Sequence, residues 1–142
     1  MTDFILHEKL KTDAIELARL DLTLLLLMNA RQWPWLILVP QRPDVREIHE
    51  LPALDRTILM DEVAHCSRLL TDLFKPDKIN IGALGNIVPQ LHVHAIARSK
   101  TDPAWPKPVW GTIAPEPYPP DELAARLADI YSALSIRRAD AH

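Results

Sequence analysis

Cysteine and long apolar runs are scarce in this chain of 142 residues. The single cysteine, Cys66, cannot form an internal disulfide, which favours a reducing compartment. The longest apolar run, Leu24–Met28, is far too short to span a bilayer. The first residues, Met1-Thr2-Asp3-Phe4, lack the basic stretch and apolar core of a signal peptide. We therefore expect a cytoplasmic protein with no membrane partner.

A basic excess is also missing, since the formal net charge is −3 at pH 7. Proteins that bind nucleic acids or anionic membranes broadly need such an excess, so we expect no nucleic-acid partner. A small phosphate ligand is still compatible with this charge, because a few backbone N–H groups can hold it locally. The apolar fraction of 48% and the charged fraction of 25% indicate an ordinary globular protein.

Glycine is rare, with three residues against thirteen prolines, and many of the prolines lie between Pro103 and Pro120. Because proline fixes φ and removes a backbone donor, we expect an extended, irregular arm at about residues 99–120. The chain length suits one domain with a substantial core. Residues 1–142 are therefore predicted to form a single domain that carries this arm.

Three segments have the apolar spacing of a helix. The strongest pattern covers residues 53–74 and is followed by a proline. A second pattern, over residues 121–134, begins after two prolines, which suits the first turn of a helix. A weaker pattern covers about residues 4–20, where Thr12 or Asp13 could act as N-cap.

Short apolar or alternating runs predict the strands, which lie at residues 22–29, 36–39, 78–83 and 90–98. The strands come in consecutive pairs that the longest helix separates. This order predicts an α+β fold with an antiparallel sheet and helices on one face.

The strongest functional signal is the segment Gln90-Leu91-His92-Val93-His94, in which polar and apolar residues alternate. In a strand, Gln90, His92 and His94 project from one face of the sheet. Imidazole acts as acid, base, nucleophile or metal ligand near neutral pH, so we expect the chemistry here. Two satisfied polar side chains on an exposed sheet face are the plainer alternative.

A metal site is a further alternative, because two histidines two residues apart can bind zinc. Such a site needs a third protein ligand, and the candidates His49, His65 and Cys66 have no supporting spacing. We therefore expect no metal site.

Residues 84–98 resemble the signature of the histidine triad (HIT) superfamily, in which three histidines alternate with apolar residues along one strand. The middle histidine of that family is the nucleophile and corresponds to His92. The last corresponds to His94, whereas the first corresponds to Gln90, so the chain departs from the full triad. The resemblance covers most of the chain, since it extends through residues 34–40, 51–74 and 102–106.

The resemblance implies a HIT-like fold with a sheet of about five strands, a long helix and a C-terminal helix. Family members are nucleotidyl hydrolases or transferases that work at an α-phosphate and typically form homodimers in which two sheets join. We therefore expect a nucleotide substrate, such as a nucleoside phosphoramidate or a dinucleoside polyphosphate, and a covalent nucleotidyl-His92 intermediate. No cofactor is required, although Mg²⁺ could accompany a polyphosphate substrate.

The substrate contacts expected around His92 come from the motif and the resemblance together. His94 would donate a hydrogen bond to a phosphate oxygen, and Gln90 would donate an amide N–H. Asn86 lies where the family holds phosphate, with a residue of a tight turn as the alternative. Asn29 lies where the family contacts the ribose hydroxyls, with a residue at the end of a hairpin strand as the alternative. Arg98 is a candidate phosphate contact, with a surface charge as the alternative.

For His92 we expect the Nδ1–H group to donate to a backbone carbonyl or a carboxylate, so that Nε2 faces solvent. An amide at position 90 cannot relay a proton as imidazole can, which leaves a nucleotide-binding module without turnover as the alternative function. The family also often carries Gly-His where this chain has Pro34-Trp35. Trp105 and Trp110 in the arm are expected to pack at a rim or dimer interface rather than against a base.

Overall fold

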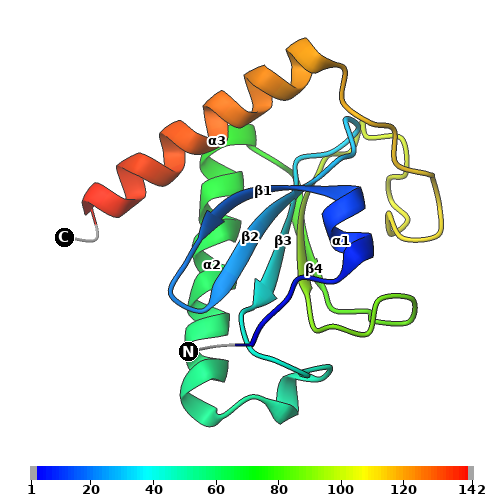
Figure 1. Cartoon of the computed structure of the whole chain (residues 1–142). Helices are drawn as coiled ribbons and strands as arrows, with labels where there is room; N and C mark the ends of the chain where they lie inside the picture. Colours follow the sequence, from blue (N-terminus) through cyan, green and yellow to red (C-terminus); the bar gives the residue numbers. More distant parts are fainter. Residues whose placement is uncertain (1–2, 141–142) are drawn as a thin grey trace.

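A computed structural model describes residues 3–140. Within that range, five strands form one antiparallel sheet in the order β1-β2-β3-β5-β4 (Figure 1). The expected α+β class and the number of strands are confirmed. The strands are β1 (Ala14–Arg19), β2 (Thr23–Met28), β3 (Trp35–Pro40), β4 (Lys78–Gly82) and β5 (Val93–Arg98). The helices are α1 (Glu8–Asp13), the 3₁₀ helix η1 (Ile48–Glu50), α2 (Ala53–Phe74) and α3 (Pro120–Asp140).

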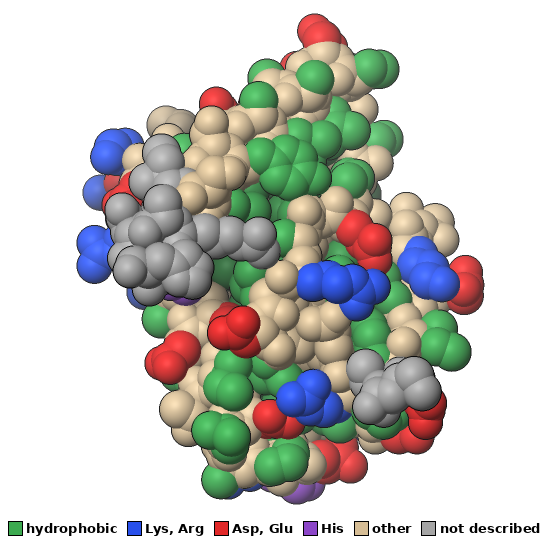
Figure 2. Space-filling view, turned by 60° about the vertical axis from the view of Figure 1, so that its left-hand side comes forward, with side chains coloured by type: hydrophobic (Ala, Val, Ile, Leu, Met, Phe, Trp, Pro, Cys, Tyr) green, Lys and Arg blue, Asp and Glu red, His purple; other side chains and the backbone are tan. Residues whose placement is uncertain are grey.

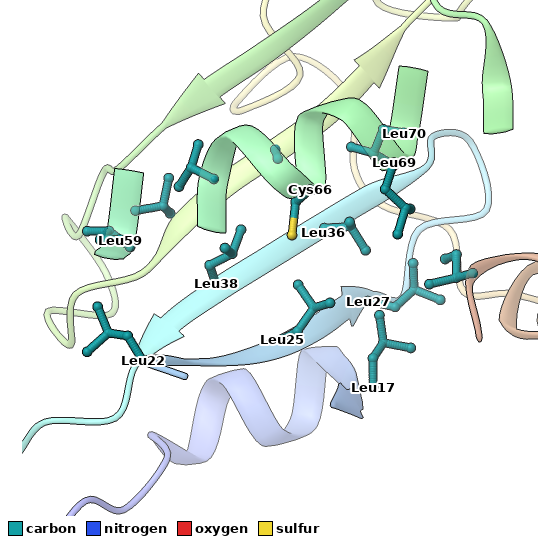
Figure 3. Packing of buried hydrophobic residues seen from close by; sticks show 14 of the residues in the cluster. Leu17, Leu22, Leu25, Leu27, Leu36, Leu38, Leu59, Cys66, Leu69 and Leu70 are labelled. Atoms are coloured by element: carbon teal, nitrogen blue, oxygen red, sulfur yellow. The ribbon is translucent and has the colours of Figure 1, made fainter. Parts of the chain in front are cut away.

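The longest buried helix, α2, forms where the spacing predicts it. It follows Pro52 and ends at Phe74, and the left-handed backbone of the C-cap Lys75 (φ 49°) closes the last turn before Pro76. Its apolar stripe packs on the sheet, and Figure 3 shows that stripe over the leucines of β2 and β3. The buried residues of the stripe are Leu59, Val63, Cys66, Leu69 and Leu70.

Of the helix expected over residues 4–20, only residues 8–13 are helical, and the expected N-cap at Thr12 or Asp13 is wrong. α1 ends at Asp13, and residues 14–19 form β1, which pairs with β2 from Ala14–Met28 to Arg19–Leu24. The backbone of β2 provides hydrogen-bond partners along its whole length. Pairing with it outweighs the weak local preference of residues 14–19 for helix. The N-cap is His7, whose Nδ1 accepts from the Lys9 amide at 3.1 Å.

The alternation of side chains in the central strands divides the core into two clusters. One face packs against α2 and α3, through residues such as Leu25, Leu27, Leu36 and Leu38. The opposite face carries Leu24, Leu26, Ile37 and Val39, which pack with the α1 residue Leu10 and with Val109 of the arm. α1 and the arm therefore cover the second face, whereas all helices were expected on one face (Figure 1).

The arm has no helix or strand within residues 99–119 of the described chain. Its base is fixed by Arg98, which is 2% exposed and makes a two-point ion pair with Asp102 at 2.8 and 3.2 Å. The Arg98 guanidinium also donates to the Asn80 side chain and to the Lys107 carbonyl. Burial alone would raise the pKa of Asp102, but hydrogen bonds from Arg98 and from backbone amides hold it well below its usual range.

On the face shown in Figure 2, acidic and basic side chains are interspersed and neither sign gathers into a patch. Among residues 3–140, no helix is both long enough and apolar enough to cross a membrane.

Candidate active site

The two motif histidines lie side by side on the sheet face that α1 and the arm cover. Their ring centroids are 5.0 Å apart, and each side chain is 7% exposed. The sequence predicted a strand over residues 90–98, which would include Gln90 and His92. In the structure β5 begins at Val93, so both residues lie just before the strand. The predicted shared face of His92 and His94 is nevertheless present.

His92 is held through its inner nitrogen. The Nδ1 atom lies 2.7 Å from the carbonyl oxygen of Gln90. Because a carbonyl only accepts, Nδ1 carries the proton and the neutral ring leaves Nε2 free to act as a base or nucleophile. Burial lowers the pKa of His92 and the Gln90 carbonyl opposes this effect, with a net pKa below 6.5. The ring is therefore neutral near pH 7, in the tautomer that the sequence analysis expected.

His94 is held in the opposite tautomer. The indole N–H of Trp35 donates to its Nδ1 at 2.9 Å, so the neutral ring carries its proton on Nε2. Burial lowers the pKa of His94 to about 3, with a further contribution from the neighbouring His92. His94 can thus donate a hydrogen bond but has no tendency to become charged near pH 7.

Trp110 of the arm closes over this pair. Its ring lies 5.4 Å from that of His94, at 63°. Gly82 of β4 is the cross-strand partner of His94, and a Cβ at Gly82 would lie 2.9 Å from the Trp110 ring. The absence of a side chain at Gly82 is what lets Trp110 approach, so this glycine serves a close contact.

Two pockets in the described region meet at His92. An apolar pocket of about 480 Å³ lies between α1 and the arm, and His92 and His94 are both in its wall. A second pocket of about 640 Å³ lies on the other side of His92, towards η1 and the start of α2. The apolar pocket includes Leu10, Met28, Trp35, Ile37, Trp110 and Ile113. The second pocket includes Arg46, His49, Arg56 and Gln90. His92 is therefore accessible although little of its surface is exposed.

The side chain of Gln90 is turned towards the N-terminal segment. Its Oε1 accepts from the His7 amide at 2.8 Å, and its Nε2 donates to the Ile5 carbonyl at 2.9 Å. Both polar ends of this amide therefore have backbone partners, so the expected hydrogen bond to a substrate phosphate stays a prediction that depends on the second N–H of Nε2.

The remaining candidates divide into one at the site and two in the scaffold. Asn86 is exposed in the wall of the apolar pocket, close to His92 in the same lining. Asn29 uses its Oδ1 to accept from the Tyr118 amide at 2.9 Å, so it anchors the arm instead of facing the pocket. Arg98 is buried in the arm's base, which overturns both the phosphate contact and the surface charge that were expected of it.

Sequence reasoning missed Trp35 as the partner of His94, and it expected Trp110 at a rim or dimer interface, whereas the structure places Trp110 in the wall of the apolar pocket. For Trp110 a signal existed, because a glycine inside a strand often marks a close approach by another group. No local pattern could have identified Trp35, since its bond spans 59 positions. Within residues 3–140, no group of three or more His, Cys, Asp or Glu side chains is arranged to hold a metal ion.

Comparison with known proteins agrees with this geometry. The profile of the HIT domain matches residues 9–101, which is more than half of the chain. The chain belongs to the HIT domain family. Proteins with this HIT fold generally bind nucleotides and act as hydrolases or transferases. A search of curated proteins finds no match.

Solved HIT structures superpose closely on this HIT domain. A histidine triad protein from Bradyrhizobium japonicum is 43% identical with a TM-score of 0.89, over 92% of this chain and 97% of that one. One from Sinorhizobium meliloti is 49% identical with a TM-score of 0.89, over 92% and 97%. One from Marinobacter aquaeolei is 45% identical with a TM-score of 0.90, over 93% and 96%.

Proposed function

We propose that the protein is a nucleotidyl hydrolase or transferase that acts at the α-phosphate of a nucleoside phosphate derivative through a covalent nucleotidyl-His92 intermediate. The observation that carries this proposal is that hydrogen bonds hold two neighbouring imidazoles in opposite tautomers. His92 has a free Nε2 lone pair because its Nδ1–H donates to a carbonyl, and His94 has an Nε2–H because its Nδ1 accepts from Trp35. One nucleophile and one neutral donor, 5.0 Å apart, suit attack on a charged phosphate.

The first half-reaction follows from these two tautomers. The Nε2 lone pair of His92 forms a bond to the α-phosphorus while the bond from phosphorus to the leaving group breaks. His92 becomes cationic in this step, and the Gln90 carbonyl that accepts its Nδ1–H stabilises that charge. His94 donates its Nε2–H to a non-bridging oxygen. Water or another acceptor then attacks phosphorus and releases His92.

The two pockets suggest how the substrate is oriented. The nucleoside occupies the apolar pocket beside Trp110, with the α-phosphate at His92 and near Asn86. The leaving group then extends into the second pocket, where Arg46 and Arg56 outnumber the one acidic residue, Glu47, and favour an anionic group. Such a leaving group needs no proton from residue 90, so a dinucleoside polyphosphate fits better than a phosphoramidate. Mg²⁺ could screen the charge of that substrate, and no resident cofactor is part of the proposal.

Position 90 supports a second candidate function. We infer that Gln90 stands where the family has its first triad histidine, and an amide offers no proton relay. A protein that binds nucleotides without turning them over is therefore the alternative. Calorimetry with AMP and GMP, run beside a turnover assay, separates the two, because tight binding without turnover favours the binding module.

A homodimer is part of the proposal. β4 is an edge strand with no second partner among the described residues, and Ile81 at its end is 47% exposed. An exposed edge with apolar side chains suits pairing with the same edge of a second copy. Sedimentation should give the mass of two chains, and Ile81→Lys should shift the protein towards the monomer. A cytoplasmic location stays a prediction.

The experiment that tests the proposed activity replaces His92 by Ala and by Gly. Turnover of a diadenosine polyphosphate and of an adenosine phosphoramidate should fall by about 10⁴-fold or more, the scale seen when a nucleophile is removed. His65→Gln is the matched control, because His65 is exposed on α2 and lines neither pocket. Unchanged turnover in the His92 variants would exclude His92 as the nucleophile.

A further inference from the structure

We propose that Gln90 is a positioning residue that sets nucleotide affinity. Its amide fastens the N-terminal segment, residues 3–7, which leads into α1, and α1 forms one wall of the nucleoside pocket. The consequence for affinity rests on the proposed function, whereas the fastening itself is a property of the ligand-free protein. The proposal accounts for a glutamine at a place where the family resemblance leads one to expect an imidazole.

The side-chain amide of Gln90 forms hydrogen bonds with the backbone of an extended segment, as a neighbouring β-strand would. Its carbonyl oxygen accepts from the His7 N–H at 2.8 Å and its amino group donates to the Ile5 C=O at 2.9 Å. These two backbone groups belong to residues two apart, which is the spacing at which an extended chain presents a donor and an acceptor on the same side. The planar amide thus substitutes for a neighbouring strand. The two nitrogens of an imidazole ring point in diverging directions, so a histidine could not bond both groups.

The fastened segment needs an external attachment. Residues 3–7 belong to no helix or strand, and α1 that follows has six residues, which is too short to be stable alone. Leu6 and Leu10 pack on the sheet at 5% exposure each, but apolar contact does not fix the position of a backbone along the surface. Gln90 does so, through two directional bonds across more than 80 positions.

That segment leads directly into the pocket wall. Lys9, Leu10 and Asp13 of α1 line the apolar pocket opposite the arm. The backbone carbonyl of Gln90 also holds Nδ1 of His92. One residue therefore ties the wall that contacts the nucleoside to the ring that contacts the phosphate.

The opposite wall of the pocket is fastened by the same arrangement. Gln32, in the connection between β2 and β3, donates from Nε2 to the Ala114 carbonyl at 2.8 Å. Its Oε1 accepts from the Glu116 amide at 2.9 Å, so the bonded backbone groups are again two residues apart. Ile113 and Pro115, beside these groups, line the apolar pocket. Each of the two walls thus has a glutamine amide that bonds backbone groups two residues apart, beside other attachments such as Asn29 and Arg98 for the arm, which supports a positioning role for both glutamines.

The test compares Gln90→Met with Gln41→Met. Methionine keeps the length of glutamine and removes both bonds. Gln41 is a matched control because its amide also bonds on both sides, to the Leu22 carbonyl and from Arg19, yet it lines neither pocket that meets at His92. The measurements are hydrogen exchange of the His7 amide without ligand, the AMP dissociation constant by calorimetry, and KM and kcat.

In Gln90→Met we expect the His7 amide to exchange at least about 10-fold faster and AMP to bind about 10-fold more weakly, from the loss of two hydrogen bonds. KM should rise by a similar factor while kcat stays within about 3-fold. Gln41→Met should leave all four quantities unchanged. Gln90→Glu keeps the acceptor and loses the donor, so it should fall between wild type and Met, and it serves if the Met variant fails to fold.

Two results would overturn the proposal. Unchanged exchange of the His7 amide in both Gln90 variants would show that the amide does not fasten the segment. A large fall in kcat at constant KM, or a higher kcat in Gln90→His, would assign residue 90 to the catalytic step instead. If wild-type protein binds no AMP, the proposed function fails, and the exchange measurement still decides the fastening.

Discussion

The two faces of the sheet are built from the same strands but are closed by different forces. Under α2, leucines from β2 and β3 meet the apolar stripe of the helix in a continuous core (Figure 3). On the other face, the short helix α1 and the irregular arm leave a pocket, and both are attached by directional polar bonds. A sheet with α2 on one side can therefore hold a partly open site on the other.

The two faces also differ in how they bury histidine. The α2 face has no imidazole in its cluster of described buried residues, whereas the pocket face buries two. Each neutral ring has a partner on Nδ1, a carbonyl for His92 and an indole N–H for His94. A buried polar group that is hydrogen-bonded avoids most of the desolvation penalty.

The largest expected difference between the faces appears with a substitution in the α2 core. Leu70→Ala removes a side chain with no exposed surface and should lower the free energy of unfolding by about 2–5 kcal/mol. Denaturant titration measures this loss. Because Leu70 lies across the sheet from the pocket, kcat below the melting temperature should not change. Met60→Ala on the exposed side of α2 is the control and should cost little. A fall in kcat in Leu70→Ala without a loss of stability would contradict the separation of the two faces.

Acid should lower the free energy of unfolding, because the two buried histidines of the pocket face resist protonation. Below pH 6.5 an unfolded histidine takes up a proton that His94, with a pKa of about 3, does not take up when folded. Stability is therefore fully present well above pH 6.5 and falls as the pH decreases, by about 1–2 kcal/mol from His94 between pH 6.5 and pH 5. The lowered pKa of His92 adds to this loss.

Denaturant titrations at pH 6.5 and pH 5 measure the effect of acid. The carboxylate of Asp102 does not contribute in this window, because the stability that its lowered pKa provides is lost only as the pH falls below the ordinary value of 3.8. His94→Gln should flatten the dependence, and His65→Gln, on the exposed side of α2, should leave it intact. Equal stability of the wild type at the two pH values would show that the histidines charge freely in the folded state.

An effect smaller than that of Leu70→Ala is expected from Gly82→Ala. The new Cβ would meet the Trp110 ring at 2.9 Å, so either the ring or β4 must shift. Overpacking of this kind should cost about 1–3 kcal/mol and should also weaken AMP binding, since Trp110 lines the pocket. In a Trp110→Leu background the same substitution should cost less, and the double-mutant cycle gives the interaction. Strict additivity would mean that Gly82 and Trp110 do not contact one another.

Much of the fold could be predicted because strong periodic patterns agree with their surroundings. α2, β2 and β3 lie where their apolar spacing indicates, and their buried side chains pack together in one core cluster. β1 could not be predicted, since Leu10, Ala14 and Leu17 have helical spacing and only pairing with β2 makes a strand there. Local pattern fails where a long-range partner decides the structure.

The site was predictable to the same extent. His92 and its bond to a carbonyl follow from the motif and from the chemistry that a nucleophilic imidazole needs. The roles of Gln90, Asn29 and Arg98 did not follow, because each has its partners in segments distant in sequence or in the irregular arm. A polar side chain near a motif has no visible direction in a sequence, and the direction decides whether it meets substrate or scaffold.

The most direct test of the account is to trap the nucleotidyl-enzyme. Enzyme in excess over a diadenosine polyphosphate is quenched in alkaline denaturant, where a bond between phosphorus and imidazole nitrogen survives, and its peptides are analysed by mass spectrometry. We expect one nucleotidyl group on the peptide that contains His92, located on that residue and missing in His92→Ala. Full turnover by the wild type with no adduct, or with the adduct on another residue, would contradict it.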